Sequence, residues 1–579
     1  MLDFKSIIKK MKMKYFKYLF IVVAFISTII SCKKDLTVTN NNEPSLDALN
    51  SETGVINYAA GGVFIAGFGD ETHNSVQTIN DQLGQGFMML VIGGHESLGD
   101  NIYIPWGNNS FKFSDNPQSW KLDNGTVIPN PIGQGQISEL RLRNDRAYGA
   151  SNSFLPEWTY MYFLNNSTNV LLSKVDGTAF SGDAATKKKV LQAWGYWWKG
   201  YAYSRIGSMY TAGIITDVPN QTTGNFVVHD AIIAEANKNF DKAATLLGGL
   251  TSGGVYDQVL SNLIPSYIQV GKGQIPSPAM WVRSINTMKA RNLLVNKKTK
   301  DMVPADWNAV LTLANTGIKS TDNVFMIRTF DDNQKCIVDK DGNLGGSTAN
   351  IYAATENGST FFASERLIQD YNIGDKRLAN NFALRASPIV NKRGRGLNFG
   401  TRYYLQGFDG TIPSIPGVIK YCELAPTGNQ DYYLAGTWEE NELMIAEALI
   451  NTGQIDPGLS HIDAVRDAEG AGIAHVSGTG LNLVNAKEQL RRERRTGLFL
   501  RGLAFYDARR WSVIDDVSKG GGRSGSVVLS NGPSNVGGGT FVNTNCFINY
   551  NYLNYWDVPK NELEFNAPLP GSAPVISPF

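Results

Sequence analysis

The sequence predicts a mainly α-helical protein in which pairs of helices support a loop-rich face that carries a few short strands. Long segments repeat apolar residues at the spacing of one helix face. Consecutive helical segments combine large residues with Gly and Ala, which indicates closely packed helix pairs of the tetratricopeptide kind. The repeat is degenerate, because no strict period of about 34 residues holds along the chain. Between the helical segments lie short alternating runs and turn signals, which favour loops with short strands.

The first 31 residues have the pattern of a signal peptide for export. Six lysines precede Tyr18–Ile30, an uncharged run of thirteen residues. A helix of this length rises only about 20 Å, which is less than the roughly 30 Å hydrocarbon core of a membrane. The run is followed by Ser31 and Cys32, and this junction resembles the lipobox of bacterial lipoproteins. We therefore expect residues 1–31 to be removed, Cys32 to carry the lipid, and residues 32–50 to form a polar tether.

Charge and motifs exclude several classes of function. Without residues 1–31 the chain carries 47 Lys and Arg and 51 Asp and Glu, and this small net charge does not favour nucleic acid. The sequence contains no GxxxxGK[ST] phosphate loop, no GxSxG elbow and no HExxH zinc helix. The five histidines lie far apart, and the cysteines form no CxxC pair. We expect no metal, no cofactor and no catalytic residue.

After the tether, we divide the chain into two halves, residues 51–322 and 323–579, and both contain predicted helices. Asp230 is a candidate N-cap of the third helix. Between Val324 and Gly436 the helical period weakens, and the Gly-rich segment 519–539 predicts a surface loop without regular structure. The predicted helices span 157–175, 187–210, 230–247, 278–295, 304–318, 437–453 and 459–468.

A basic run from Arg491 to Arg495 could indicate contact with nucleic acid, but its neighbours favour another interpretation. The stretch LRRERRTGLFLRGLAFYDARRW alternates arginines with Leu, Phe and Trp at helix spacing, so several of these arginines should lie against a core. Arginines in such positions usually meet carboxylates through two hydrogen bonds. We therefore predict structural ion pairs of Arg494 and its neighbours, with Glu493, Asp507 and Glu447 as candidate partners.

The same stretch, Glu493 to Trp511, resembles the "ER…E(L/F)..EG.R..DL.RW" block of the SusD/RagB family of nutrient-binding outer-membrane lipoproteins of Bacteroidota. Two departures stand out. Arg501 replaces the usual acidic residue after the ER block, and the closing "PIP" is reduced to residues 557–559. Further blocks resemble the family in the same order along the chain: 157–169, 373–377, 442–454, 464–470 and 556–571.

The resemblance implies a SusD-like α-α superhelix at the outer membrane, anchored by its lipid and facing the cell exterior. It implies capture of oligosaccharides and their delivery to a SusC-like TonB-dependent barrel, not bond cleavage. A peptide-binding RagB-like protein of the same fold is the first alternative. A surface glycoside hydrolase is a weaker one, because acidic pairs such as Asp331-Asp332 and Glu439-Glu440 are better explained by a solvated turn or a first helical turn.

A glycan site needs exposed aromatic rings, because the CH faces of sugars stack on Trp and Tyr while polar side chains bind the hydroxyl groups. The segment 100–120 is the best candidate, because its rings lie among Asn, Gly and Pro and not on a helix stripe. The irregular middle region offers further rings. The predicted ligand-binding residues are Tyr103, Trp106 and Trp120, followed by Tyr352, Tyr403 and Tyr404.

Overall fold

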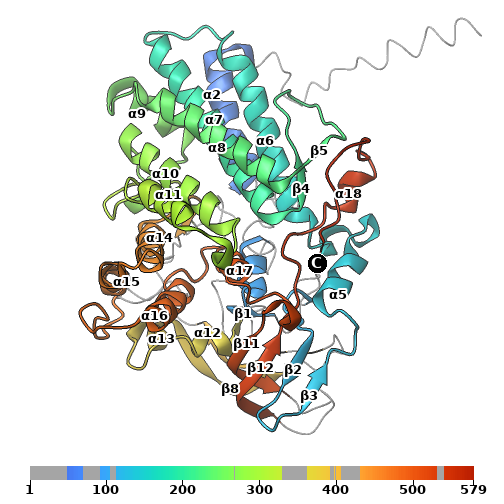
Figure 1. Ribbon diagram of the computed structural model, residues 1–579. Helices are drawn as coiled ribbons and strands as arrows, with labels where there is room; N and C mark the ends of the chain where they lie inside the picture. The colour runs from blue at the N-terminus through green and yellow to red at the C-terminus, as the bar shows by residue number, and fades with distance from the viewer. Residues whose placement is uncertain are drawn as a thin grey trace, which may run out of the picture.

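The computed structural model describes residues 49–68, 91–104, 113–266, 268–328, 362–390, 397, 399–405, 431–530 and 540–578. Helices make up most of these residues, and the strands are short and form small sheets. The prediction of a mainly α protein with a few short strands is therefore confirmed. In Figure 1 the helices form the upper and left parts of the molecule, and most of the strands lie at the lower end.

The helices keep the labels of Figure 1. Shorter helical turns of other types occur at 61–68, 146–151, 271–273, 299–301 and 517–519. The α-helices are α2 (Glu52–Ala60), α4 (Gly93–Leu98), α5 (Gln136–Arg143), α6 (Leu155–Val175), α7 (Ala184–Met209), α8 (His229–Leu247), α9 (Gly254–Leu263), α10 (Pro278–Val295), α11 (Pro304–Ala314), α12 (Glu365–Ile368), α13 (Lys376–Asn381), α14 (Trp438–Asn451), α15 (Ile455–Ala468), α16 (Leu483–Thr496), α17 (Ala504–Arg510) and α18 (Lys560–Leu563).

Neighbouring helices pack in pairs, α6 on α7, α7 on α8, α10 on α11 and α14 on α15. Small residues allow the close approach. A Cβ atom on Gly195 would lie 2.9 Å from Leu172 of α6, and one on Gly200 would lie 2.6 Å from Phe240 of α8. Trp194, Trp197 and Trp198 of α7 are fully buried in the aromatic core. None of the helices in the described ranges is long and apolar enough to cross a membrane.

A four-stranded antiparallel sheet joins distant parts of the chain in the order β11-β12-β2-β3. Trp120 of β2 lies opposite Ile548 of β12 on one side and Ile128 of β3 on the other. The strands of this sheet are β2 (Ser119–Lys121), β3 (Val127–Pro129), β11 (Arg523–Ser530) and β12 (Phe541–Asn549). The paired strands elsewhere are β1 (Ile102–Tyr103) with β7 (Phe362–Ala363), β4 (Ala212–Ile214) with β5 (Phe226–Val228), β6 (Met326–Arg328) with β10 (Asp431–Tyr433), and β8 (Phe382–Val390) with β9 (Gly400–Leu405).

Two local predictions were wrong. The Gly-rich segment 519–539 contains strand β11, because pairing with β12 supplies the hydrogen bonds that its own sequence does not favour. Asp230 is not the N-cap of α8, since Val228 holds that position and Asp230 lies in the first turn. The segment from Leu483 to Arg510 forms two helices, α16 and α17, separated by a turn in which Gly502 has a positive φ of 68°.

Candidate functional site

The six predicted ligand-binding rings do not form one exposed group. Trp106 and Tyr352 lie outside the described residues, as does Cys32. Tyr103 and Trp120 are buried with no exposed surface, which corrects the expectation that they protrude from a loop. Both belong to strands, and this explains their burial.

Tyr103 pairs with Phe362 across β1 and β7. Trp120 lies between two strands of the four-stranded sheet and stacks on Phe399, with 5.6 Å between the ring centroids. Tyr403 and Tyr404 on β9 are half-buried and pack against the core. Neither tyrosine lines any of the three cavities described next.

The first cavity, which we call the Trp438 pocket, has a volume of about 190 Å³. Its wall includes two half-buried rings, Tyr433 and Trp438. The lining also contains apolar side chains and several charged and polar ones, among them Lys272, Ser320 and Glu439. Half-buried rings beside several hydrogen-bonding groups are the combination that sugar binding requires.

The two rings of the Trp438 pocket are fixed by local structure. Trp438 is the first residue of α14, and the helix is capped by the Thr437 hydroxyl, which accepts a hydrogen bond from the backbone N–H of Glu440 at 3.2 Å. Tyr433 ends β10 and lies opposite Met326 of β6. The guanidinium of Arg501 lies 4.5 Å from the centre of the Tyr433 ring. Arg501, which stands where the family block usually has an acidic residue, therefore forms part of the wall of this pocket.

Trp438 was not among the predicted site residues. In the sequence it lies within the predicted helix 437–453, next to Glu439, whose position indicated only a first-turn acid. A large aromatic residue at the first position of a helix, directly after a capping threonine, is the signal that could have identified it. The first residue of a helix has no preceding turn to cover its side chain, so its ring can face an opening.

A second cavity of about 530 Å³ is lined by His229, Tyr555 and Arg509, together with Lys297 and Lys298. The Tyr555 ring stacks on the His229 imidazole with 4.1 Å between centroids. The Arg509 guanidinium also lies 4.1 Å from the centre of the Tyr555 ring. Tyr555 already contacts two side chains, whereas the Trp438 pocket has a second ring, Trp438, besides the Tyr433 ring that Arg501 contacts. The second cavity is therefore less suited to stacking a sugar than the Trp438 pocket.

The third cavity, of about 390 Å³, is lined by arginines of α16 and is described under the further inference. Behind it lie the predicted ion pairs. Arg494 donates to Asp507 at 2.8 and 3.0 Å, and Arg510 contacts both Asp507 and Glu447. Burial raises the pKa of Asp507, but Arg494 and Arg510 outweigh it and hold that pKa below its ordinary value.

Glu493 forms ion pairs with arginines of other helices and not with Arg494 or its neighbours on α16. It accepts hydrogen bonds from Arg377 of α13 at 2.6 Å and from Arg466 of α15 at 2.8 Å. These contacts connect the ER block to the segments 373–377 and 464–470, which carry two of the other family-like motifs. Within the described part of the chain, no group of three or more His, Cys, Asp or Glu side chains could hold a metal ion.

Comparisons with known proteins show what the chain is similar to. No family model and no curated protein matches it. A SusD-like carbohydrate-binding protein from Bacteroides fragilis is 14% identical, matches over 90% of this chain and 99% of its own, and has a TM-score of 0.54. A putative sugar-binding protein from Bacteroides vulgatus is also 14% identical, with the same coverages and a TM-score of 0.51.

A SusD-like protein from Bacteroides fragilis is 12% identical, covers 91% of this chain and 99% of its own, and has a TM-score of 0.50. These matches run over nearly the whole length of both chains, so they concern the complete arrangement of helices and not one motif. The protein therefore has the SusD-like fold.

Proposed function

We propose that this protein captures oligosaccharides at the Trp438 pocket and passes them to a SusC-like TonB-dependent transporter. The observation that carries the proposal is the pairing of Trp438 and Tyr433 with charged side chains in one cavity. Two solved proteins of the same fold, described as carbohydrate-binding and sugar-binding, support it. The proposed role is binding and not bond cleavage, because both neighbours are described as binding proteins.

In this proposal the lipid on Cys32 holds the protein at the outer membrane, on the outside of the cell. The polar residues 32–50 act as the tether between the lipid and the folded part. Replacement of Cys32 by Ala should release the protein from the membrane fraction. Surface accessibility to an added protease in intact cells tests which side of the membrane the protein faces.

Isothermal titration with a panel of oligosaccharides and oligopeptides tests the binding function. Trp438→Ala should weaken binding of the best glycan on the order of tenfold, because a stacked ring contributes about 1 kcal/mol or more. Tyr148→Ala is the matched control, because Tyr148 is an exposed ring outside the three cavities. Tight binding of peptides alone would favour the peptide-binding alternative.

Delivery to a transporter is tested separately. Affinity purification of the lipidated protein from detergent-solubilised outer membranes should recover a TonB-dependent barrel in comparable amounts. Incubation of the purified protein with its bound glycan should leave the glycan intact by chromatography. Appearance of shorter products would show a hydrolase and overturn the binding role.

A further inference from the structure

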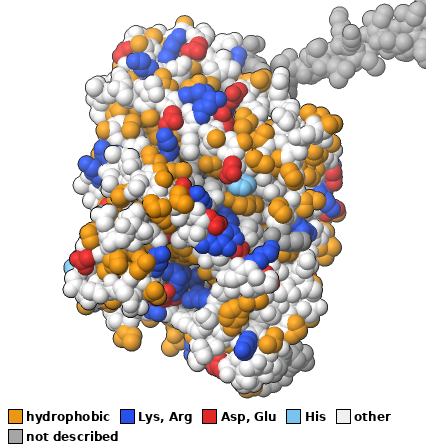
Figure 2. Space-filling model, viewed as in Figure 1, with side chains coloured by type: hydrophobic (Ala, Val, Ile, Leu, Met, Phe, Trp, Pro, Cys, Tyr) orange, Lys and Arg blue, Asp and Glu red, His pale blue; other side chains and the backbone are white. Residues whose placement is uncertain are grey.

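The third cavity, which we call the arginine pocket, has a volume of about 390 Å³ and lies between α16, α17 and β11. Figure 2 shows Lys and Arg side chains gathered in a hollow of the viewed face, over the region of α16 and α17. The arginines that line this pocket are Arg491, Arg492 and Arg495 from α16 and Arg523 from β11. Trp511, half-buried after the end of α17, lines it as well.

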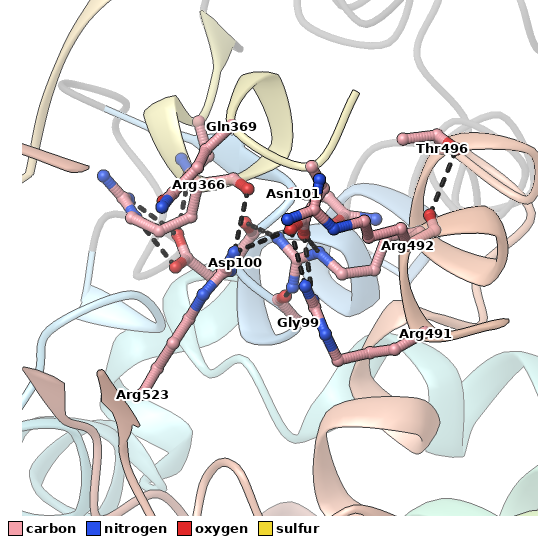
Figure 3. A network of polar contacts seen from close by, with 12 residues as sticks. Gly99, Asp100, Asn101, Arg366, Gln369, Arg491, Arg492, Thr496 and Arg523 are labelled. Carbon is pink, nitrogen blue, oxygen red and sulfur yellow. Dashed lines mark hydrogen bonds and ion pairs between the residues drawn. The ribbon is translucent and has the colours of Figure 1, made fainter. Parts of the chain in front are cut away.

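Three of these arginines meet at one buried carboxylate. Asp370 accepts hydrogen bonds from Arg491 at 2.7 and 3.1 Å and from Arg523 at 3.0 Å. Nε of Arg495 lies 2.6 Å from Oδ2 of Asp370. Burial raises the pKa of Asp370, but the three guanidinium groups outweigh it and hold this pKa far below its ordinary value. Figure 3 shows Arg491 and Arg523 extending toward one another from α16 and β11.

The remaining carboxylates at the pocket do not balance the arginines. Glu488 accepts from Arg491 at 2.7 and 2.8 Å and from Arg492 at 2.8 Å. Asp507 also lines the pocket, but it is bound to Arg494 and Arg510. Four arginines therefore share the two negative charges of Asp370 and Glu488, which leaves two positive charges in excess.

The adjoining pair of Arg366 and Asp100 does not remove this excess. Arg366, shown in Figure 3, contacts the Asp100 carboxylate, so that pair is neutral. Arg495 directs its terminal nitrogens to the backbone carbonyls of Gly99 and Asp100, which carry no formal charge. Burial, and after it the nearby Arg523, lower the pKa of Arg495 to about 10. A bound anion would relieve this crowding of cations.

Arg492 supplies an accessible donor at the mouth of the pocket. Its side chain is 32% exposed. Within the described part of the chain, only its Nε donates to a carboxylate, that of Glu488. The two terminal nitrogens thus present a planar fork, the geometry that matches two oxygens of a carboxylate or sulfate. The hydroxyl of Ser524 offers a further contact to a sugar ring beside that group. The Trp511 indole also lines the pocket, with its N–H donated to Glu447 at 3.3 Å and Arg510 4.5 Å from its ring centre.

We propose that the arginine pocket binds the anionic group of an acidic sugar, a carboxylate or a sulfate ester, within a captured glycan. This inference rests on the proposed glycan-binding function and names its substrate class. The pocket is large enough for one sugar residue, and Arg492 with Arg491 provides the charge that holds it. Neutral glycans gain nothing from this site.

Isothermal titration at low salt compares three ligands of equal length: a trigalacturonate, a 6-sulfated galactose trisaccharide and a neutral galactose trisaccharide. Arg492→Gln should weaken binding of the anionic ligands about tenfold. Glu488→Gln, which removes a negative charge from the same pocket, should strengthen it. Raising the salt concentration should reduce binding of the anionic ligands and leave that of the neutral one unchanged.

Arg141→Gln is the matched control, because Arg141 is 25% exposed and bound to Asp557, and it lines none of the three cavities. It should bind all three ligands like the unmodified protein. Thermal unfolding of each variant verifies that it is folded. The opposite effects of Arg492→Gln and Glu488→Gln distinguish a ligand site from a structural ion-pair network, in which both changes would only destabilise.

The outcomes separate this inference from the proposed function. Preference for trigalacturonate identifies a carboxylate, and preference for the sulfated ligand identifies a sulfate ester; both support the inference. Binding of neutral glycans with equal affinity in every variant retains the glycan-binding function and overturns the arginine pocket. Binding of none of the glycans, with peptides bound instead, overturns both.

Discussion

Arg510 donates two hydrogen bonds to the carboxylate of Glu447, at 2.5 and 2.7 Å, and so connects α17 to α14. Both side chains are buried. Arg510 also donates to Asp507, which is shared with Arg494. This chain of charges joins three helices of the C-terminal half, α14, α16 and α17, beside the arginine pocket.

We expect Glu447→Leu to lower the free energy of unfolding by about 3 to 5 kcal/mol, because it leaves the Arg510 guanidinium buried without one of its two carboxylates. The double variant Glu447→Leu with Arg510→Met should recover part of this loss, and urea unfolding measures both. Glu564→Leu is the control, since its pair with Arg146 is exposed and should contribute less than about 1 kcal/mol. Additive effects of the two core changes would contradict the coupling.

Glu96 makes the stability depend on pH. It is buried and accepts hydrogen bonds from Asn101 at 2.8 Å and from the backbone N–H of Gly502 at 3.1 Å. Burial raises its pKa from 4.5 to about 7. Between these values the folded protein binds more protons than the unfolded chain, so the free energy of unfolding falls as the pH rises through this window.

We expect Glu96→Gln to remove this decrease. Between pH 4.5 and pH 8 the free energy of unfolding of the unmodified protein should fall by on the order of 3 kcal/mol more than that of the variant. An altered hydrogen bond in the variant would shift its whole profile by a constant and leave this difference in slope unchanged. Urea unfolding at four pH values across this range gives both profiles. Parallel profiles would show that Glu96 is not the titrating group.

Gly99 allows α4 to approach α17. A Cβ atom on Gly99 would lie 2.4 Å from the backbone carbonyl carbon of Ala504. We expect Gly99→Ala to lower the free energy of unfolding by about 1 to 3 kcal/mol through overpacking. Gly177→Ala should be nearly neutral, because the nearest atom to its Cβ would be 3.8 Å away. Equal midpoints of urea unfolding for the two variants would disprove the steric argument.

Cys546 should be chemically inert in the folded protein. Its side chain is buried, and burial together with the nearby Asp123 raises the pKa of the thiol to about 12. Iodoacetamide at pH 8 should leave it unmodified until urea unfolds the protein. Peptide mapping by mass spectrometry distinguishes Cys546 from the other cysteines, and rapid native modification would contradict the buried position.

The helices could be predicted because their signal is local. The buried stripe of α7, with Trp194, Trp198 and Tyr201, repeats at helix spacing and is visible in the sequence. The SusD-like fold followed from six motifs in order. The ion pair of Arg494 with Asp507 could also be predicted, because Asp507 lies on the next helix along the chain.

The site was harder to predict because burial in strands depends on distant partners. Asn and Pro around Trp120 are typical of a loop, but β12 from the far end of the chain pairs with this segment and covers the ring. Arg523 lies in a Gly-rich stretch that shows no sign of the strand that aims it at Asp370. Trp438 lies in the first turn of a predicted helix, where the neighbouring acids indicated a helix start and not a binding site.

The sheet that holds Trp120 also limits when folding can finish. Strands β2 and β3 leave the ribosome long before their partner β12, which lies far along the chain from them. Until residue 549 has emerged, Ile548 cannot pair opposite Trp120, and a chain truncated before β12 lacks this neighbour. The helical layers can condense as they appear, whereas the four-stranded sheet assembles only after β12 has been synthesised.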